Sequence, residues 1–313
     1  MPSPLERASV GLVVVAVVPY VTLKVLWLAG STVGVSDEAA LAELHSTRMV
    51  VGNNITIVLD LLAIGLALGL TSAWGRRVPA WFMLGLGAGA TGLLAPILLG
   101  LPLGTVLQLV VEGNVRTGGM DRMSPWVFAT VYGGFAAMAV GISVLAWRYA
   151  ARRWDDVLRR APEPPAGWAG VLGALGLLPF GAAMLWWGLS GPGDSGPQAM
   201  DAVSQRTTLV VTGLLGIAGF VTPLVRDTAS RAPRMAWLVT WVGCTTAALQ
   251  APTLMLLANG GHPTHAIVLI GLLTIPGSSV YGLSVLRRRL VRDRARQDST
   301  TVGAGRGLNH ATP

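Results

Sequence analysis

The chain has 313 residues, of which 52% are hydrophobic and only 12% are charged, and its formal net charge is +8. A soluble domain carries about 25% charged residues, so this composition excludes an ordinary soluble globular protein. The basic residues cluster in short loops beside apolar segments, which is typical of membrane topology and argues against a nucleic-acid partner. We therefore predict an all-α, polytopic membrane helix bundle.

Eight apolar segments are predicted to cross the membrane, because each is long enough to reach across the roughly 30 Å of a bilayer core. In chain order they cover residues 9–30, 50–73, 80–103, 125–147, 168–189, 207–225, 236–258 and 266–286. Between the first two segments, residues 37–48 are expected to lie at the outer interface as a short amphipathic stretch. Residues 104–113 are expected to form a separate interfacial or re-entrant helix.

The arginines predict how the chain is oriented. With the N-terminus inside, 18 of the 22 arginines fall on the cytoplasmic side and four on the other. Such a bias follows the positive-inside rule, so both termini are expected in the cytoplasm of a cell whose plasma membrane holds the protein. The basic cytoplasmic loops are expected to contact anionic lipid headgroups of the bilayer, although topology alone also explains them.

Matching residues in the two halves indicate an internal repeat. A proline and a tryptophan stand eight residues apart in the first and fifth segments, as Pro19 and Trp27 and as Pro179 and Trp187. The third and seventh segments share an Ala-Trp and an Ala-Pro pair at matched spacing. We predict a parallel 4+4 repeat over residues 1–160 and 161–290, followed by a basic, disordered cytoplasmic tail over 291–313. Chance similarity among apolar segments is the alternative.

A candidate buried polar site follows from Lys24, the only lysine of the chain, which lies inside the first segment. A charge in hydrocarbon costs roughly 2.5–3.5 kcal/mol on insertion scales, so it is either functional or paired. Asp60 lies at a similar depth in the adjacent antiparallel segment, and we predict a Lys24–Asp60 ion pair, structural or functional. The remaining polar candidates are Asn53, Asn54 and Gln250, of which Asn53 shares a helix face with Asp60.

The pattern Pro-Tyr-x-x-x-Lys-x-x-Trp-x-x-Gly runs from Pro19 to Gly30. In this pattern and in its general layout the chain resembles uncharacterised multi-pass membrane proteins of high-GC Gram-positive bacteria. The resemblance covers mostly the first span. It implies a membrane protein and no particular activity.

Motifs for catalysis are missing from the sequence, which contains no H-E-x-x-H, G-x-S-x-G or phosphate-loop pattern. A single cysteine excludes an intramolecular disulfide, and the few histidines are weak evidence for a metal, so no metal and no cofactor is predicted. The first functional hypothesis is a permease-like or small-molecule-binding membrane protein with a buried Lys/Asp site. The alternative is a membrane scaffold or regulatory partner acting through basic cytoplasmic loops. A membrane enzyme has no motif in its favour.

Overall fold

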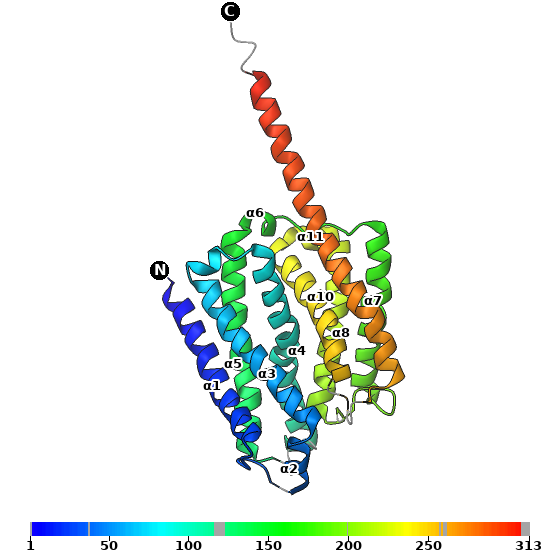
Figure 1. Cartoon of the computed structure of the whole chain (residues 1–313). Helices are drawn as coiled ribbons and strands as arrows, with labels where there is room; N and C mark the ends of the chain where they lie inside the picture. Colours follow the sequence, from blue (N-terminus) through cyan, green and yellow to red (C-terminus); the bar gives the residue numbers. More distant parts are fainter. Residues whose placement is uncertain are drawn as a thin grey trace, which may run out of the picture.

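The computed structural model describes residues 2–36, 38–115, 123–198, 200–256, 258 and 262–307, and its regular elements in these ranges are helices (Figure 1). The long ones are α1 (Pro4–Leu28), α3 (Thr47–Thr71), α4 (Ala80–Glu112), α5 (Pro125–Arg153), α7 (Gly167–Ser190), α8 (Val203–Val221), α10 (Pro233–Leu256) and α11 (His265–Gly307). The short ones are α2 (Glu38–Leu44), α6 (Asp155–Leu158) and α9 (Arg226–Arg231), with the 3-10 turns η1 (Trp74–Arg76) and η2 (Thr222–Leu224).

Among the described residues, seven helices are long and apolar enough to cross a membrane. Large apolar side chains such as Val15 and Leu61 stay more than half exposed on their outer surfaces, as expected of a surface that faces lipid. The chain is therefore a helical membrane protein with several spans. The stretch expected at the outer interface contains the short helix α2.

Helix α10 takes the place of the predicted seventh segment but is not among these seven helices, so seven of the eight predicted spans are found among the described residues and the eighth stays a prediction. The helix is less apolar because it carries several threonines and Gln250. It packs against α4, α8 and α11, and buried positions such as Thr240 and Thr246 face these neighbours. These polar residues are thus covered by protein. The Thr240 hydroxyl donates to the Ala236 carbonyl of its own helix, whereas the Thr246 hydroxyl has no partner among the described residues.

The prediction of a separate helix over residues 104–113 was wrong, because α4 continues without a break to Glu112. At 33 residues it is roughly 50 Å long and exceeds the thickness of a bilayer core. Pro96 and Pro102 lie inside it without ending it. The helix stops only at Gly113, whose φ of 70° is the left-handed conformation that favours glycine after a helix.

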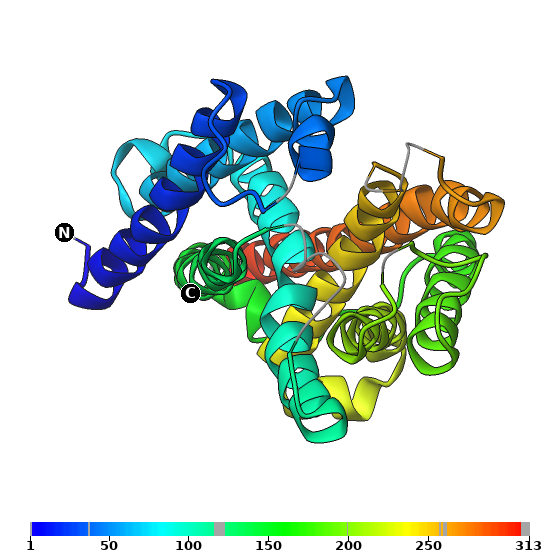
Figure 2. The same cartoon turned by 90° about the horizontal axis from the view of Figure 1, so that it is seen from below.

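The long helices form two groups, each with a hydrophobic core of its own. The first core is built from α1, α3, α4 and α5, and the second from α7, α8, α10 and α11. Helix α4, drawn in cyan to teal, lies between the two groups in Figure 2 and packs against both α8 and α10. Small residues allow this close contact, since Gly92 meets the backbone of Thr245 and Gly104 meets the backbone of Ser204.

The N-terminus and the far end of α11 lie at the same end of the bundle (Figure 1). Helix α11 runs past the bundle in helical conformation to Gly307, while its side chains beyond Leu290 and residues 308–313 lie outside the described part of the chain. The disordered tail expected over 291–313 therefore stays a prediction.

At this end of the bundle, the connection between the two groups is held by polar contacts. Asp155 of α6 bonds to Arg159 and, across to α10, to the Arg234 guanidinium at 2.6 Å. The Trp237 indole donates to the Arg160 carbonyl at 2.8 Å. Hydrogen bonds from Arg159 and Arg234 hold the pKa of the Asp155 carboxyl below its ordinary value of 3.8. Since Asp155 is exposed to solvent, these bonds position α6 more than they stabilise the fold.

Close packing of α1 on α5 predicts an effect for Gly141→Ala. A Cβ there would lie 2.7 Å from Val13 Cγ2 and 2.9 Å from the Ser9 carbonyl oxygen. The clash is expected to lower the free energy of unfolding by about 1–3 kcal/mol in a detergent titration. Gly85→Ala is the matched control, because no atom lies within 4 Å of its added Cβ and alanine favours a helix. Equal behaviour of the two variants would contradict this packing.

Asp155→Asn is expected to make the amide hydrogens of α6 exchange a few-fold faster at pH 7, because both arginine contacts are weakened. A carboxyl with a lowered pKa stabilises the fold above its unfolded pKa and loses that effect as the pH falls through its folded pKa. The difference between the variant and the wild type should therefore shrink as the pH falls below about 3.8 and disappear only below the lowered pKa of the folded state. A difference that stays constant as the pH falls would show that Asp155 acts other than through its charge.

Candidate functional site

Lys24 and Asp60 form an ion pair between α1 and α3. The Lys24 Nζ lies 3.1 Å from Asp60 Oδ2, Lys24 has no exposed surface and Asp60 is 4% exposed. Both charges are thus withdrawn from solvent and from lipid, and each neutralises the other in a low-dielectric environment. The two helices run in opposite directions, so that residues 36 positions apart meet at one depth.

An aromatic ring completes the surroundings of the lysine. Tyr20 precedes Lys24 by one helical turn, and the Lys24 Nζ lies 3.5 Å from the centre of its ring. A cation over the face of an aromatic ring is attracted by the electrons of that face. The Tyr20 ring in turn meets Phe135 of α5 edge-on, with 5.2 Å between the ring centres. Three helices therefore hold the ammonium group in place.

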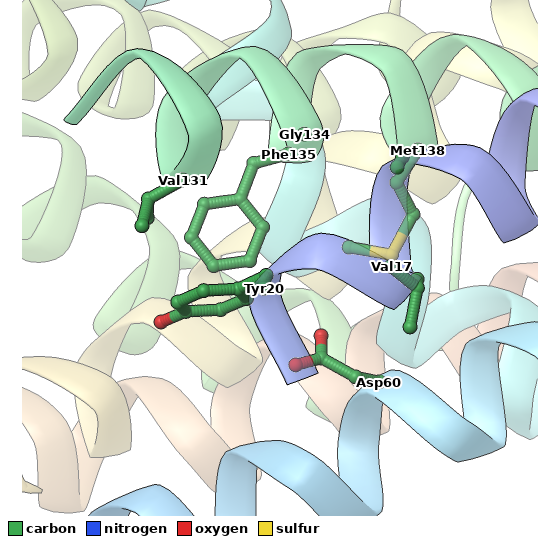
Figure 3. A pocket seen from close by; sticks show the side chains of 8 residues that line it. Val17, Tyr20, Asp60, Val131, Gly134, Phe135 and Met138 are labelled. Atoms are coloured by element: carbon green, nitrogen blue, oxygen red, sulfur yellow. The ribbon is translucent and has the colours of Figure 1, made fainter. Parts of the chain in front are cut away.

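A narrow crevice reaches the carboxylate from the side of α5 (Figure 3). It is too narrow to hold a water molecule, whereas common ligand pockets measure roughly 300–1,000 Å³. Asp60 supplies its carboxylate, and Lys24 does not line the crevice. The other lining residues are apolar or aromatic and come from α1 and α5: Ala16, Val17, Tyr20, Val131, Gly134, Phe135 and Met138.

The Asp60 carboxylate uses one oxygen for the pair. Its other oxygen, Oδ1, has no hydrogen-bond partner within the described ranges of the chain. A carboxylate can accept several hydrogen bonds or a second cation, so Asp60 keeps unused capacity beside the crevice.

The three other polar candidates fall in different places. Asn53 is 8% exposed on α3, about two turns from Asp60, and its Nδ2 is buried without a partner among the described residues, so it remains a candidate donor. Asn54 is exposed and donates to the Val50 carbonyl of its own helix, outside the site. Gln250 lies between α10 and α4, where its Nε2 is 3.5 Å from the Leu93 carbonyl oxygen.

Tyr20 and Phe135 belong to the site but were not among the sequence candidates. Tyr20 has a signal in the sequence, because an aromatic residue four positions before a buried lysine lies on the same helix face. Phe135 has none, since only the packing of α5 on α1 brings it to the crevice.

The second half of the chain offers an apolar counterpart. Met184 follows Pro179 at the same distance as Lys24 follows Pro19. It is 1% exposed and packs beside Phe180 and Trp187. Gly216 of α8 lies against the Phe180 ring. In the first half, the comparable neighbour of Tyr20 is Asp60 of α3. Helix α7 thus packs into its core with the uncharged Met184 at the position that Lys24 takes in α1.

We predict strong coupling between the two charges. Lys24→Met leaves the Asp60 carboxylate buried without a partner and is expected to lower the free energy of unfolding by about 3–5 kcal/mol. Adding Asp60→Leu removes that charge, so the double variant should recover most of the loss. A detergent unfolding titration of the two single variants and the double variant measures the coupling. Equal stability of Lys24→Met and the double variant would contradict the pairing.

Function has to be inferred from these residues alone. A comparison of the chain with protein-family models, with curated proteins and with solved structures finds no match.

Proposed function

We propose that this chain is a permease-like membrane protein that binds a small ligand at the Lys24–Asp60 site. The observation that carries the proposal is Met184, because it fills the corresponding position of α7 in a fully packed core. The helix motif therefore does not require a charge. A buried ion pair is often no more stable than an apolar replacement, so its presence in one half only points to a use beyond packing.

Binding at this site would work by exchange of partners. In the closed arrangement each charge satisfies the other, and a ligand has to offer Asp60 or Lys24 an equivalent partner. The crevice between α1 and α5 ends at Asp60, which makes the carboxylate the first charge that a ligand would meet. Separation of α1 from α5 would widen this approach.

A parallel 4+4 repeat is part of the proposal. The nine residues 11–19 and the nine residues 171–179 share one order of buried, half-buried and exposed positions. Trp27 and Trp187 both donate their indole N–H to the loop after their own helix, to the Val33 carbonyl and the Ser195 hydroxyl. Each half has its own core, with α1 packed on α5 and α7 packed on α11. Duplications of this kind are common in transporters.

Both termini are proposed to lie in the cytoplasm, with the plasma membrane as the location. The arginine bias supports this orientation, and the ends of α1 and α11 lie at one end of the bundle. Anionic lipid headgroups are the proposed partners of the basic loops there.

A scaffold or regulatory partner is the second candidate function. The closed, dry state of the pair favours it, since Lys24 has no exposed surface and the crevice is small. In that case the ion pair would be a structural clamp and the basic loops would carry the function.

Ligand-dependent stabilisation of the purified protein separates the two functions. A thermal-shift screen would compare small amines, carboxylates and zwitterions on the wild type and on the Lys24→Met/Asp60→Leu double variant. We expect at least one class to raise the melting temperature of the wild type and not that of the double variant. Met184→Leu serves as the control that keeps both charges. A full screen without a shift, or equal shifts in both proteins, would favour the scaffold function.

A further inference from the structure

We propose that the ligand of the Lys24–Asp60 site is a small organic cation that enters beside Asp60 and is exchanged for the proton of Lys24. This inference rests on the proposed function and names the class of ligand that the site would take. It also gives the pair a role that an inert clamp lacks.

The chemistry of the crevice selects a cation. Its only charged lining group is the Asp60 carboxylate, and the rings of Tyr20 and Phe135 stand beside it (Figure 3). A carboxylate together with aromatic faces is the combination that recognises ammonium groups. An anion would meet the carboxylate and the apolar side chains Val131 and Met138 before it could reach Lys24, which does not line the crevice.

The size of the crevice limits that cation. In this closed arrangement the crevice is too narrow for a water molecule, so entry needs a separation of α1 from α5, which favours a small cation over a large ligand. The lining also lacks the several polar groups that a sugar or a nucleotide would require, because Asp60 and the Tyr20 hydroxyl are its only polar side chains.

Charge balance then links the cation to a proton. With Lys24 protonated and Asp60 ionised, the pair is neutral, and adding a cation would leave one uncompensated positive charge in a buried site. Release of one proton from the Lys24 ammonium restores neutrality, because the neutral amine remains beside a carboxylate that is now paired with the ligand. The N–H bond of Lys24 breaks, the electron pair stays on Nζ and the proton passes to water.

Few other ionisable groups face this exchange. Helix α3 contributes Asp60 itself, and Tyr20 of α1 interacts electrostatically with it. Tyr132 of α5 interacts in turn with Tyr20. Among the described residues no further acidic or basic side chain is hydrogen-bonded or ion-paired to Lys24 or Asp60. The proton released therefore comes from Lys24.

Calorimetric titration with tetramethylammonium tests this exchange, since this probe carries a charge that does not vary with pH. For release of one proton per cation, the dissociation constant should fall about tenfold per pH unit between pH 6.5 and 8.5, and a dye in weak buffer should register one proton. Tert-butanol, a neutral molecule of similar shape, should not bind. Met184→Leu should bind as the wild type does.

Two variants make the test specific. Asp60→Asn keeps the shape of the side chain and should abolish binding. Lys24→Met should still bind the cation, now without pH dependence, and bound tetramethylammonium should raise its melting temperature because it replaces the missing partner of Asp60.

Cation binding that is independent of pH in the wild type, or that survives in Asp60→Asn, would overturn the exchange, as would loss of cation binding in Lys24→Met. The outcomes also separate this inference from the function on which it rests. If carboxylates or zwitterions bind through Lys24 and cations do not, the inference fails while the ligand-binding function stands. If no class binds, both fail.

Discussion

The need to neutralise a charge away from water governs the first half of this protein. Lys24 has no exposed surface, and a lone ammonium at such a position would cost several kcal/mol. Its partner on α3 and the Tyr20 ring on its own helix remove that cost together. Because Asp60 lies on the neighbouring helix, the pair also sets the register between α1 and α3.

Comparison of the two halves separates what the fold requires from what it tolerates. Pro19 and Pro179 precede a buried tryptophan by the same distance, and both tryptophans bond to the loop that follows. Between proline and tryptophan one half buries a lysine and the other a methionine to the same degree. Under the proposed repeat, the tryptophan contact belongs to the shared helix motif, whereas the charge is specific to α1. The cavity beside Met184 is accordingly apolar, while the crevice in the first half ends at a carboxylate.

Much of the architecture was predictable from sequence, for reasons that differ between elements. Long apolar runs predict helices, since a lipid environment requires every backbone group to be bonded within its own segment. The juxtaposition of Lys24 and Asp60 was expected because two neighbouring antiparallel helices place equal depths side by side. The continuation of α4 to Glu112 was not expected, since residues 80–103 already reach across a bilayer core; the whole helix packs against α8 and α10. Apolarity alone is also a poor guide to α10, whose threonines are tolerated because neighbouring helices cover them.

The crevice depends on how α5 packs on α1, and nothing in the local sequence around Asp60 predicts that Phe135 lies there.

The state of the Lys24 side chain tests the account most directly, and the chain is suited to it because Lys24 is the only lysine. Labelling with ¹⁵N-lysine gives a single side-chain nitrogen signal in an NMR spectrum. We predict an ammonium signal at neutral pH, shifted by the Tyr20 ring, that converts to an amine signal as tetramethylammonium saturates the site. An ammonium signal that stays unchanged at saturation would contradict it, and so would the signal of a solvent-exposed lysine.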